Sequence, residues 1–212
     1  HEIGRSPDAD PQVFKAKVFT DFPSCAISPN GRWLVMRVHQ GWSKSSLLMA
    51  DTRQKKLVWK EITEGKDNVY DPLPLDDLLW VRTNEGAPRY AVYAVDPNQP
   101  ERAKWKRVVA EHPEDVLTDF NVIGGEVLVA YTHEVVSRLE RFDQAGTSKG
   151  SVDLPTLGNS NGFAGLHDDS QAFFDFESFV TPPSIRRIHL RSGKVSVWKE
   201  AKAASAWSRP SI

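Results

Sequence analysis

The chain has 212 residues, of which 40% are hydrophobic and 26% charged, with a formal net charge of −1 and a mean hydropathy of −0.45. This composition excludes chain-wide disorder, and without a dense basic block it excludes a nucleic-acid-binding domain. No apolar run is long enough for a membrane span, and no signal peptide is visible at the start. The single cysteine, Cys25, excludes an internal disulfide or a thiolate zinc site, and its small, apolar neighbours predict a buried side chain.

After a flexible leader expected over residues 1–11, the first copy of a repeated β unit is predicted over residues 12–64. The turn Pro29-Asn30-Gly31 precedes a hydrophobic strand, because Asn-Gly supplies the backbone shape of a tight turn. A second turn begins at Asp51 and leads into a short strand. The expected strands of this copy are 22–27, 33–36 and 57–59.

Three further copies are predicted over residues 65–112, 113–157 and 158–200, and residues 201–212 are expected to be a tail foreign to the repeat. Each copy has the same order: an inner strand, a hydrophobic strand after a turn, an alternating strand, and a short strand after a second turn. The inner strands are expected over 69–73, 116–122 and 160–166. The hydrophobic strands are expected over 78–81, 127–129 and 172–174, the clearest alternating strands over 90–95 and 185–190, and the short strands over 105–108, 150–152 and 195–198.

Two series of turns recur with nearly the same period. The steps of the first series are 46, 48 and 44 residues, and those of the second are 45, 47 and 47 residues. Four short strands at this pitch are typical of a propeller blade, so the sequence predicts an all-β fold, a partial β-propeller of four four-stranded antiparallel blades. An all-β sandwich with evenly spaced hairpins is the alternative. The first series is counted from Asn30, Asp76, Gly124 and Asp168, and the second from Asp51, Asp96, Asp143 and Leu190.

Residues 158–162, Gly-Asn-Ser-Asn-Gly, match the Gly-x-Ser-x-Gly turn in which α/β-hydrolases lift a serine toward a histidine. That turn must open a helix, and the few residues before the next turn leave no room for one. Asp175 and His189 could be nominated as the acid and the base, but nothing in the sequence places them beside Ser160. We interpret the match as a coincidental loop and strand, and we expect no catalytic residue in this chain.

The other polar candidates favour structural roles. The six histidines show no metal-ligand spacing, and the acidic pairs are too sparse for a calcium loop, so no metal site and no cofactor are expected. Glu111 and His112 could form an acid/base pair, although a polar connection between blades is the preferred interpretation. Trp42 lies at an expected hairpin tip, and we predict that it folds back onto the next blade rather than contacting a partner.

Four segments resemble the propeller of the prolyl oligopeptidase family, in the family's order and at similar spacing. Residues 83–90 resemble its T-[ND]-x-G-A-P hairpin, and residues 105–117 resemble its W-x-x-[VI]-[VI]-P-E-H-x-x-D-V-L blade junction. Residues 131–135 are similar to its Y-x-H-[DE] strand end. The most specific match is residues 176–185, which resemble F-x-S-F-x-T-P-P-x-I.

The resemblance implies the later blades of a propeller with about seven blades. In that family the propeller covers an α/β-hydrolase domain with a Ser-Asp-His triad, and it restricts entry so that short proline-containing peptides are cleaved. The family needs no metal or organic cofactor. No catalytic, cofactor-binding or metal-binding residue of the family maps onto this chain, which is therefore expected to be inactive alone. The expected partners are the hydrolase domain of a parent serine peptidase and peptides in transit.

An independent propeller-type module for protein binding or assembly is the alternative function. Four blades could close into a small ring, or an open arc could self-associate through its exposed blade edges. The sequence leaves both arrangements open. We expect a soluble protein without nucleic-acid or membrane partners, located in the cytoplasm or the periplasm.

Overall fold

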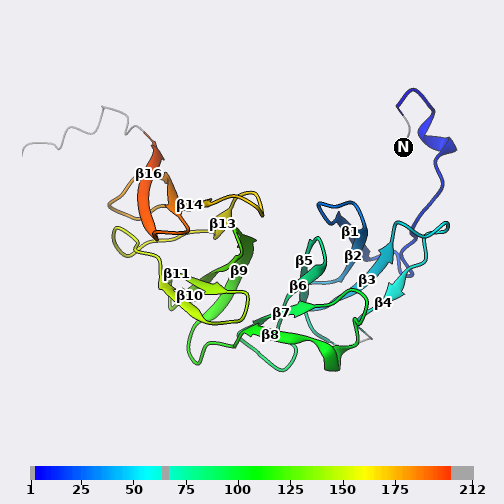
Figure 1. Ribbon diagram of the computed structural model, residues 1–212, viewed down its shortest axis with the longest axis horizontal. Helices are drawn as coiled ribbons and strands as arrows, with labels where there is room; N and C mark the ends of the chain where they lie inside the picture. The colour runs from blue at the N-terminus through cyan, green and yellow to red at the C-terminus, as the bar shows by residue number, and fades with distance from the viewer. Residues whose placement is uncertain (1–2, 64–66, 202–212) are drawn as a thin grey trace, which may run out of the picture. The chain divides into compact units, whose positions relative to one another are not determined.

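The computed structural model describes residues 3–63 and 67–201, and this part of the chain is all-β (Figure 1). The chain divides into two compact units, one containing His1–Val81 and Ala94–Trp105, the other Arg82–Tyr93 and Lys106–Ile212. Within the described residues, sixteen strands form four four-stranded sheets, and in each sheet the strands lie in chain order. The predicted fold class, four four-stranded antiparallel blades of a propeller, is confirmed.

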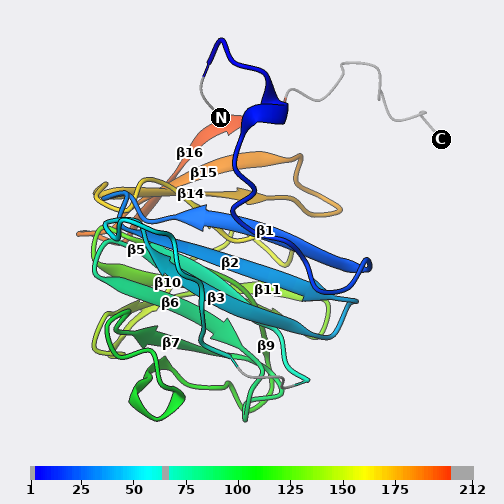
Figure 2. The same ribbon diagram turned by 90° about the vertical axis from the view of Figure 1, so that its right-hand side faces the viewer.

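The first sheet belongs to the first unit. Its strands pair antiparallel in chain order, and the second strand lies between the first and the third (Figure 2). Both faces of the middle strands carry buried side chains: Val35 and Leu47 point to one side of the sheet, and Met36 and Val38 point to the other. The strands are β1 (Asp21–Ile27), β2 (Trp33–Gln40), β3 (Ser45–Asp51) and β4 (Lys60–Glu61).

The second sheet contributes strands to both units. All five residues of its third strand are buried, so this strand is covered on both faces. A short 3-10 helix, η2 (Arg102–Lys104), precedes the last strand. The strands are β5 (Tyr70–Leu75), β6 (Leu78–Thr83), β7 (Ala91–Val95) and β8 (Lys106–Val109).

The third and fourth sheets lie in the second unit and share one apolar core, in which Phe163 and Phe174 meet edge to face at 5.6 Å between ring centres. Ile123 and Leu128 of the third sheet are fully buried in the same cluster as Ile188 of the fourth. Burial of such side chains stabilises each by about 1.5–3 kcal/mol. The strands are β9 (Val116–Ile123), β10 (Glu126–His133), β11 (Val136–Asp143) and β12 (Ser148–Ser151), then β13 (Phe163–Ala164), β14 (Gln171–Phe176), β15 (Ser184–His189) and β16 (Lys194–Glu200).

In each unit, a serine near the start of a third strand binds the backbone that leads into the next sheet. In the first unit, the Ser45 hydroxyl donates to the Tyr70 carbonyl at 3.1 Å and accepts from the Tyr70 N–H at 2.8 Å. In the second unit, the Ser137 hydroxyl donates to the Ser160 carbonyl at 3.1 Å and accepts from the Ser160 N–H at 3.0 Å. We call these pairs the serine contacts. Each serine hydroxyl thus binds one backbone carbonyl and one backbone N–H of the segment that leads into the next sheet.

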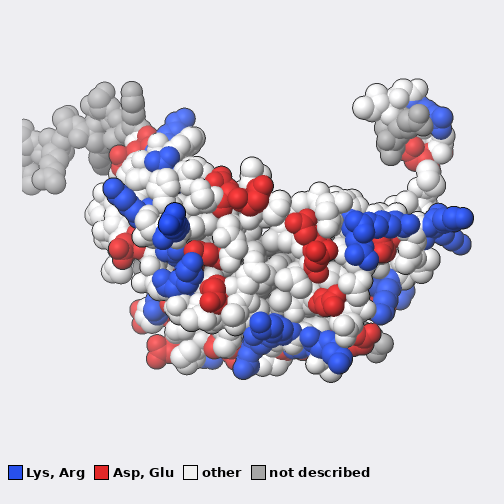
Figure 3. Space-filling model, in the orientation of Figure 1, with Lys and Arg blue, Asp and Glu red and all other residues white. Residues whose placement is uncertain are grey.

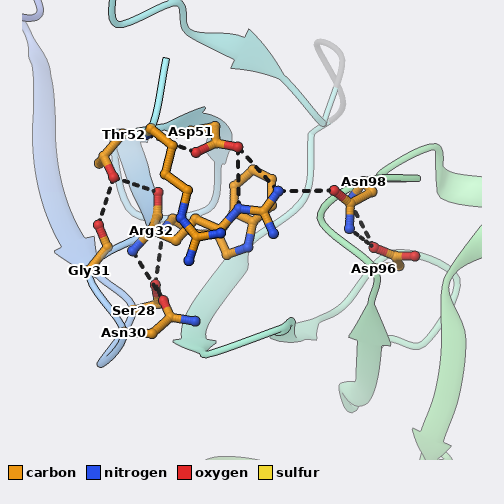
Figure 4. Close-up of polar contacts among 10 residues, drawn as sticks. Ser28, Asn30, Gly31, Arg32, Asp51, Thr52, Asp96 and Asn98 are labelled. Atoms are coloured by element: carbon orange, nitrogen blue, oxygen red, sulfur yellow. Dashed lines mark hydrogen bonds and ion pairs between the residues drawn. The ribbon is translucent and has the colours of Figure 1, made fainter. Parts of the chain in front are cut away.

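An arginine links the same pairs of sheets. Arg32 binds Asp51 with Nε and Nη2 at 3.3 and 3.2 Å and reaches the Asn98 side chain at 3.4 Å, as Figure 4 shows. In the second unit, Arg141 binds Glu126 and donates to the Leu190 carbonyl. We call these the arginine contacts. Each joins an ion pair within one sheet to the loop between the third and fourth strands of the next sheet.

Two predicted strands differ from the observed ones. The strand expected over 160–166 is reduced to Phe163–Ala164, because the residues before it make side-chain contacts instead of a ladder. The strand expected over 57–59 is observed at Lys60–Glu61 and begins three residues later, because the Trp59 indole N–H donates to the Val13 carbonyl and its ring packs edge to face on Phe14.

The prediction that Cys25 is buried is wrong, because its side chain is exposed. Every residue of β1 after Asp21 is exposed, since β1 is the end strand of its sheet and pairs only with β2. Small, apolar neighbours in the sequence are therefore a poor indicator of burial for a side chain on an edge strand. Burial of part of the thiol raises the pKa of Cys25.

Lys and Arg side chains are interspersed with Asp and Glu side chains on the face that Figure 3 shows. The chain has nearly equal numbers of the two, 27 and 28. Among the described residues, no helix is long and apolar enough to cross a membrane. Within the leader expected over residues 1–11, Pro7–Ala9 form the short 3-10 helix η1. The expected tail lies outside the described residues except for Ala201.

Candidate interaction surface

Four large apolar side chains of the second unit are exposed on connections around one cavity. Val135, Leu157, Phe179 and Val180 expose 80%, 77%, 112% and 82% of their surface, and we call them the apolar tip surface. The cavity has a volume of about 480 Å³ and is lined by Val135, Leu157 and Phe179 with the polar Glu177 at its side. Several exposed apolar side chains gathered beside a cavity are typical of an interaction site.

The tip of the β10–β11 hairpin presents Val135. His133 and Val136 form the last pair of the hairpin, so Glu134 and Val135 make a two-residue turn. Glu134 has φ of 53°, a left-handed conformation that is costly for a residue with a side chain and that suits a tight hairpin turn. The turn directs Val135 to solvent while Val136 lines the cavity.

The connection between β14 and β15 presents Phe179 and Val180. The Ser178 hydroxyl accepts from the backbone N–H of Val180 at 3.2 Å and of Thr181 at 3.0 Å. The Ser178 N–H donates to the Thr181 carbonyl at 3.1 Å. These bonds form a serine-capped turn, so the two apolar side chains are held outward by an ordered backbone rather than a loose loop.

The segment before β13 forms the floor of the cavity. Asn159 and Glu177 exchange both backbone hydrogen bonds, at 2.9 and 3.1 Å. The Ser137 N–H also donates to the Gly158 carbonyl at 2.9 Å. A Cβ on Gly158 would lie 2.4 Å from the Glu177 carbonyl and 2.6 Å from the Phe176 ring, so only glycine fits there. The floor is therefore hydrogen-bonded to β11 of the third sheet and to Glu177, which follows β14 of the fourth sheet.

The Gly-x-Ser-x-Gly segment contributes Ser160 to the serine contact described above. The Ser160 hydroxyl lies 3.4 Å from Asp175, whose carboxylate also accepts from the Asn161 backbone and side-chain amides at 2.8 and 2.6 Å. His189 lies at the other end of the strand pair, because it is opposite Gln171 whereas Asp175 is opposite Ile185. The structure thus brings Ser160 and Asp175 together without His189. That no catalytic residue is present stays a prediction.

A polar cluster lies directly beneath the β10–β11 tip. Asp115, with only 1% of its side chain exposed, binds His133 Nδ1 at 2.5 Å and Arg138 Nη1 at 2.7 Å. Burial alone would raise the pKa of Asp115, but the hydrogen bond from His133 and the charge of Arg138 outweigh it and hold this pKa below its ordinary value. The hydrogen bond to Asp115 and its negative charge raise the pKa of His133.

His112 caps the same cluster from the segment before β9. Its Nδ1 accepts from the backbone N–H of Glu114 at 3.2 Å and of Asp115 at 2.9 Å, which assigns its own proton to Nε2. The His112 ring packs on Tyr131 with 5.5 Å between ring centres. Burial raises the pKa of Tyr131 far above its usual range. The predicted polar connection between blades is therefore a histidine cap, and the Glu111 carboxylate separately accepts from the Arg89 N–H at 2.6 Å.

Ligand atoms of Glu114, Asp115 and His133 lie within 4.8 Å of one another, a spacing that a metal ion could use. His133 and Arg138 already bind the two oxygens of Asp115, so a metal ion would have to break one of these contacts at a buried carboxylate. The donor set fits an ion-pair cluster better than a metal site, and we assign no metal ligand.

The prediction that Trp42 folds back onto the next blade is wrong. Trp42 exposes 104% of its surface in the turn between β2 and β3. In its own sheet this is the connection between the second and third strands, the same connection that carries Val135 in the third sheet and Phe179 in the fourth. Gly41 before it has φ of 71°, a left-handed conformation that suits a tight turn.

The comparisons with known proteins identify the family. The family model described as "Prolyl oligopeptidase, N-terminal beta-propeller domain" matches residues 1–201. The chain belongs to this family. The resemblance inferred from the four sequence segments is confirmed.

Relatives of the propeller domain are considerably longer than this chain. The prolyl endopeptidase of Elizabethkingia miricola is 25% identical over 95% of the chain and 28% of its own length. Prolyl oligopeptidase A of Amanita bisporigera is 24% identical over 96% of the chain and 28% of its own length. The chain thus spans about 28% of the curated relatives it matches.

Solved structures agree with the fold. A structure from a study of two prolyl endopeptidases and their inter-domain dynamics superposes with a TM-score of 0.89 at 29% identity, over 94% of this chain and 29% of that chain. Prolyl oligopeptidase B from Galerina marginata, without ligand, superposes with a TM-score of 0.84 at 18% identity, over 97% of this chain and 30% of that chain.

Two of the segments that resembled the family turn out to carry the apolar tip surface of this propeller. Residues 131–135 form the tip of one hairpin, and residues 176–185 contain the serine-capped turn. Sequence reasoning recognised both segments without assigning them a surface. It did not identify Leu157 as part of the surface, nor the ion pair between Arg138 and Asp115. The one sequence feature that marks the exposed residues is an apolar residue beside a Glu or Ser in a turn, and this feature is too common to be specific.

Proposed function

We propose that this chain is the noncatalytic propeller part of a prolyl oligopeptidase-like serine peptidase, in which it gates the access of short proline-containing peptides to an α/β-hydrolase domain. The observation that carries the proposal is the family match over residues 1–201 together with a coverage of only about 28% of relatives named prolyl endopeptidase or prolyl oligopeptidase. The remaining length of those relatives is where a peptidase domain would lie. The chain alone then has no peptidase activity.

The apolar tip surface supports a docking role within such a parent protein. Its exposed side chains lie on ordered turns, so little conformational entropy is lost when a partner covers them. The hydrolase domain is tethered to the propeller in one polypeptide, so its effective concentration is high and a modest apolar contact suffices for docking.

The gating proposal is tested with the complete parent protein. We expect kcat/KM to fall more than about tenfold from short proline-containing peptides to a folded protein with exposed proline residues. Equal rates on all substrates would contradict gating. Cleavage of a proline-containing reporter peptide by the isolated chain, lost on Ser160→Ala, would contradict the noncatalytic role.

The docking proposal is tested with a matched pair of variants in the parent. Phe179→Ser removes an exposed ring of the apolar tip surface, and Leu166→Ser removes an exposed apolar side chain, 71% exposed, from the turn between β13 and β14, outside that surface. We expect peptidase kcat/KM to fall about tenfold in Phe179→Ser, from the lost burial of one aromatic side chain, and to stay unchanged in Leu166→Ser. Equal activity of both variants would contradict docking on this surface.

An independent assembly module remains the alternative. Among the described strands, β16 is the end strand of its sheet, and self-association through such edges stays a prediction. Sedimentation of the purified chain over a range of concentrations tests it. A concentration-dependent mass would support assembly, and a constant monomer mass would exclude it.

A further inference from the structure

His133 connects the tip of the β10–β11 hairpin to a different segment of the chain. It is the last residue of β10 and faces Val136 across the hairpin, so it sits at the base of the turn that presents Val135. Its Nδ1 lies 2.5 Å from Asp115, which precedes β9. The ring is 40% exposed, whereas the Asp115 side chain is 1% exposed. A titratable ring open to solvent thus joins the base of a hairpin tip to a buried carboxylate on another segment.

The charges around His133 hold Asp115 in place. Arg138 of β11 binds the other carboxylate oxygen at 2.7 Å, and it also approaches Glu140 at 3.5 Å. Two backbone N–H groups orient His112, which keeps the segment that carries Asp115 in shape. The Asp115 carboxylate therefore keeps its position when His133 gains or loses a proton. The charged or titratable groups that face the ring are His112, Glu114 and Asp115 before β9, Tyr131 and Glu134 of the β10 end, and Arg138 and Glu140 of β11.

We propose that His133 is a proton-dependent latch: its imidazolium strengthens the hold of the β10–β11 tip, and of Val135 with it, on the segment before β9, and loss of the proton loosens this hold. The latch is a property of this chain alone. Its consequence for a partner, weaker docking on the apolar tip surface in alkaline solution, rests on the proposed function.

The direction of the pH dependence follows from the charges. Asp115 and the neighbouring Glu134 raise the pKa of His133 above the ordinary value of about 6.5, while desolvation and Arg138 oppose this. The contribution of the His133 charge to the latch contact is therefore fully present below about pH 6.5 and is lost as the pH rises through the raised pKa. Asp115 stays ionised throughout, because its own pKa is lowered. A neutral imidazole can still donate one hydrogen bond, but without charge this bond is roughly half as strong.

Hydrogen exchange of the tip in the complete protein tests the latch. Amide exchange of residues 131–138, corrected for intrinsic rates, is followed across the titration of histidine in the wild type and in His133→Asn. An Asn amide places a neutral donor near the position of Nδ1, so the tip stays bonded without a titrating group. We expect protection to fall about two- to fivefold with rising pH in the wild type and to stay flat in His133→Asn. Flat protection in the wild type would overturn the latch.

A control and a second readout complete the test. His189→Gln removes a histidine at the far end of the β14–β15 pair and should keep the wild-type profile of the tip. An NMR titration of the His133 imidazole in the wild type needs no variant to fold, and a pKa at or below about 6.5 would overturn the proposal. If the tip titrates as expected while Phe179→Ser leaves peptidase activity unchanged, the latch stands and the docking proposal fails.

Discussion

The contact between the first and second sheets and the contact between the third and fourth sheets are built alike from different residues. Both have a serine contact and an arginine contact. The polarity of the ion pair is reversed: Arg32 precedes β2 and binds an acid at the end of β3, whereas Glu126 begins β10 and binds Arg141 in β11. The comparison teaches that a blade junction requires a cation that can reach the next loop, and that either strand of the pair can supply it.

The two arginine contacts differ in how deeply their ion-paired side chains are buried. The side chains of Arg32 and Asp51 are 23% and 16% exposed, and Arg32 also lies over the Trp33 ring at 4.3 Å. Arg141 and Glu126 are 8% and 5% exposed, and two parallel bonds of 2.8 and 3.0 Å join them. A buried, bidentate pair is costly to break, because the remaining partner is left as an unpaired buried charge.

The largest effect is expected for Arg141→Ala. It leaves the buried Glu126 with only the Lys149 amine, and it orphans the Leu190 carbonyl. We expect a loss of about 3 kcal/mol in the free energy of unfolding, measured by urea denaturation followed by circular dichroism. Glu126→Gln combined with Arg141→Met should recover part of this loss, since no charge is then left unpaired. A loss below about 1 kcal/mol for Arg141→Ala would show that burial of the ion pair does not increase its contribution to stability.

Acid titration sharpens the comparison by separating the causes of two lowered pKa values. The pKa of Asp51 is lowered first by the backbone N–H of Arg53, with Arg32 in a lesser role. Burial acts to raise the pKa of Glu126, but hydrogen bonds from Arg141 and Lys149 lower it overall. Both carboxylates thus contribute stability that is present above their unfolded pKa of about 4 and is lost as the pH falls through the folded pKa.

The expected result is a fall in unfolding free energy below about pH 4 that depends on the variant. In Arg141→Ala the fall should be shallower than in the wild type, because Glu126 no longer has its main partner. In Arg32→Ala it should be nearly as steep as in the wild type, because the Arg53 N–H still holds Asp51. Parallel curves for the two variants, measured by urea denaturation at several pH values, would contradict this assignment.

Much of the fold could be predicted from the sequence, since the turns that separate strands depend on local chemistry. Asn-Gly and Asp-rich turns recur at the blade period, and the four sheets begin and end near the predicted residues. The serine contacts could not be predicted. Ser45 and Ser137 bind backbone atoms 25 and 23 residues away, and a backbone partner leaves no mark in the sequence.

The candidate surface was less predictable than the fold, because exposure depends on what lies over a residue. Cys25 and Trp42 were both expected to be covered, and both are exposed. Ser160 looked like a candidate nucleophile by its flanking glycines, yet its backbone makes the serine contact and its glycine neighbour Gly158 avoids a clash with Phe176. The same residue pattern thus arises from a packing requirement in a propeller and from a catalytic turn in a hydrolase.

A smaller effect is expected for Arg32→Ala. The variant removes a partly exposed ion pair and the contact with the Trp33 ring, and Asp51 keeps its backbone hydrogen bond from Arg53. We expect a loss of about 1 kcal/mol in the free energy of unfolding. Arg32→Lys retains the charge but not the planar stacking, so it separates the two contributions. A loss as large as that of Arg141→Ala would contradict the claim that the more deeply buried ion pair contributes more to stability.

The smallest effect is expected for Asn98→Ala, which removes the far end of the first arginine contact. The Asn98 side chain accepts from Arg32 at 3.4 Å at an exposed site, and its amide also donates to Asp96 at 2.9 Å within its own turn (Figure 4). We expect a loss of about 0.5 kcal/mol. A double-mutant cycle with Arg32→Ala isolates the contact between sheets from the turn. A coupling energy near zero would mean that Arg32 acts only within its own sheet, and that other contacts, such as the serine contact and the ion pair of Arg37 with Asp71, join the first two sheets.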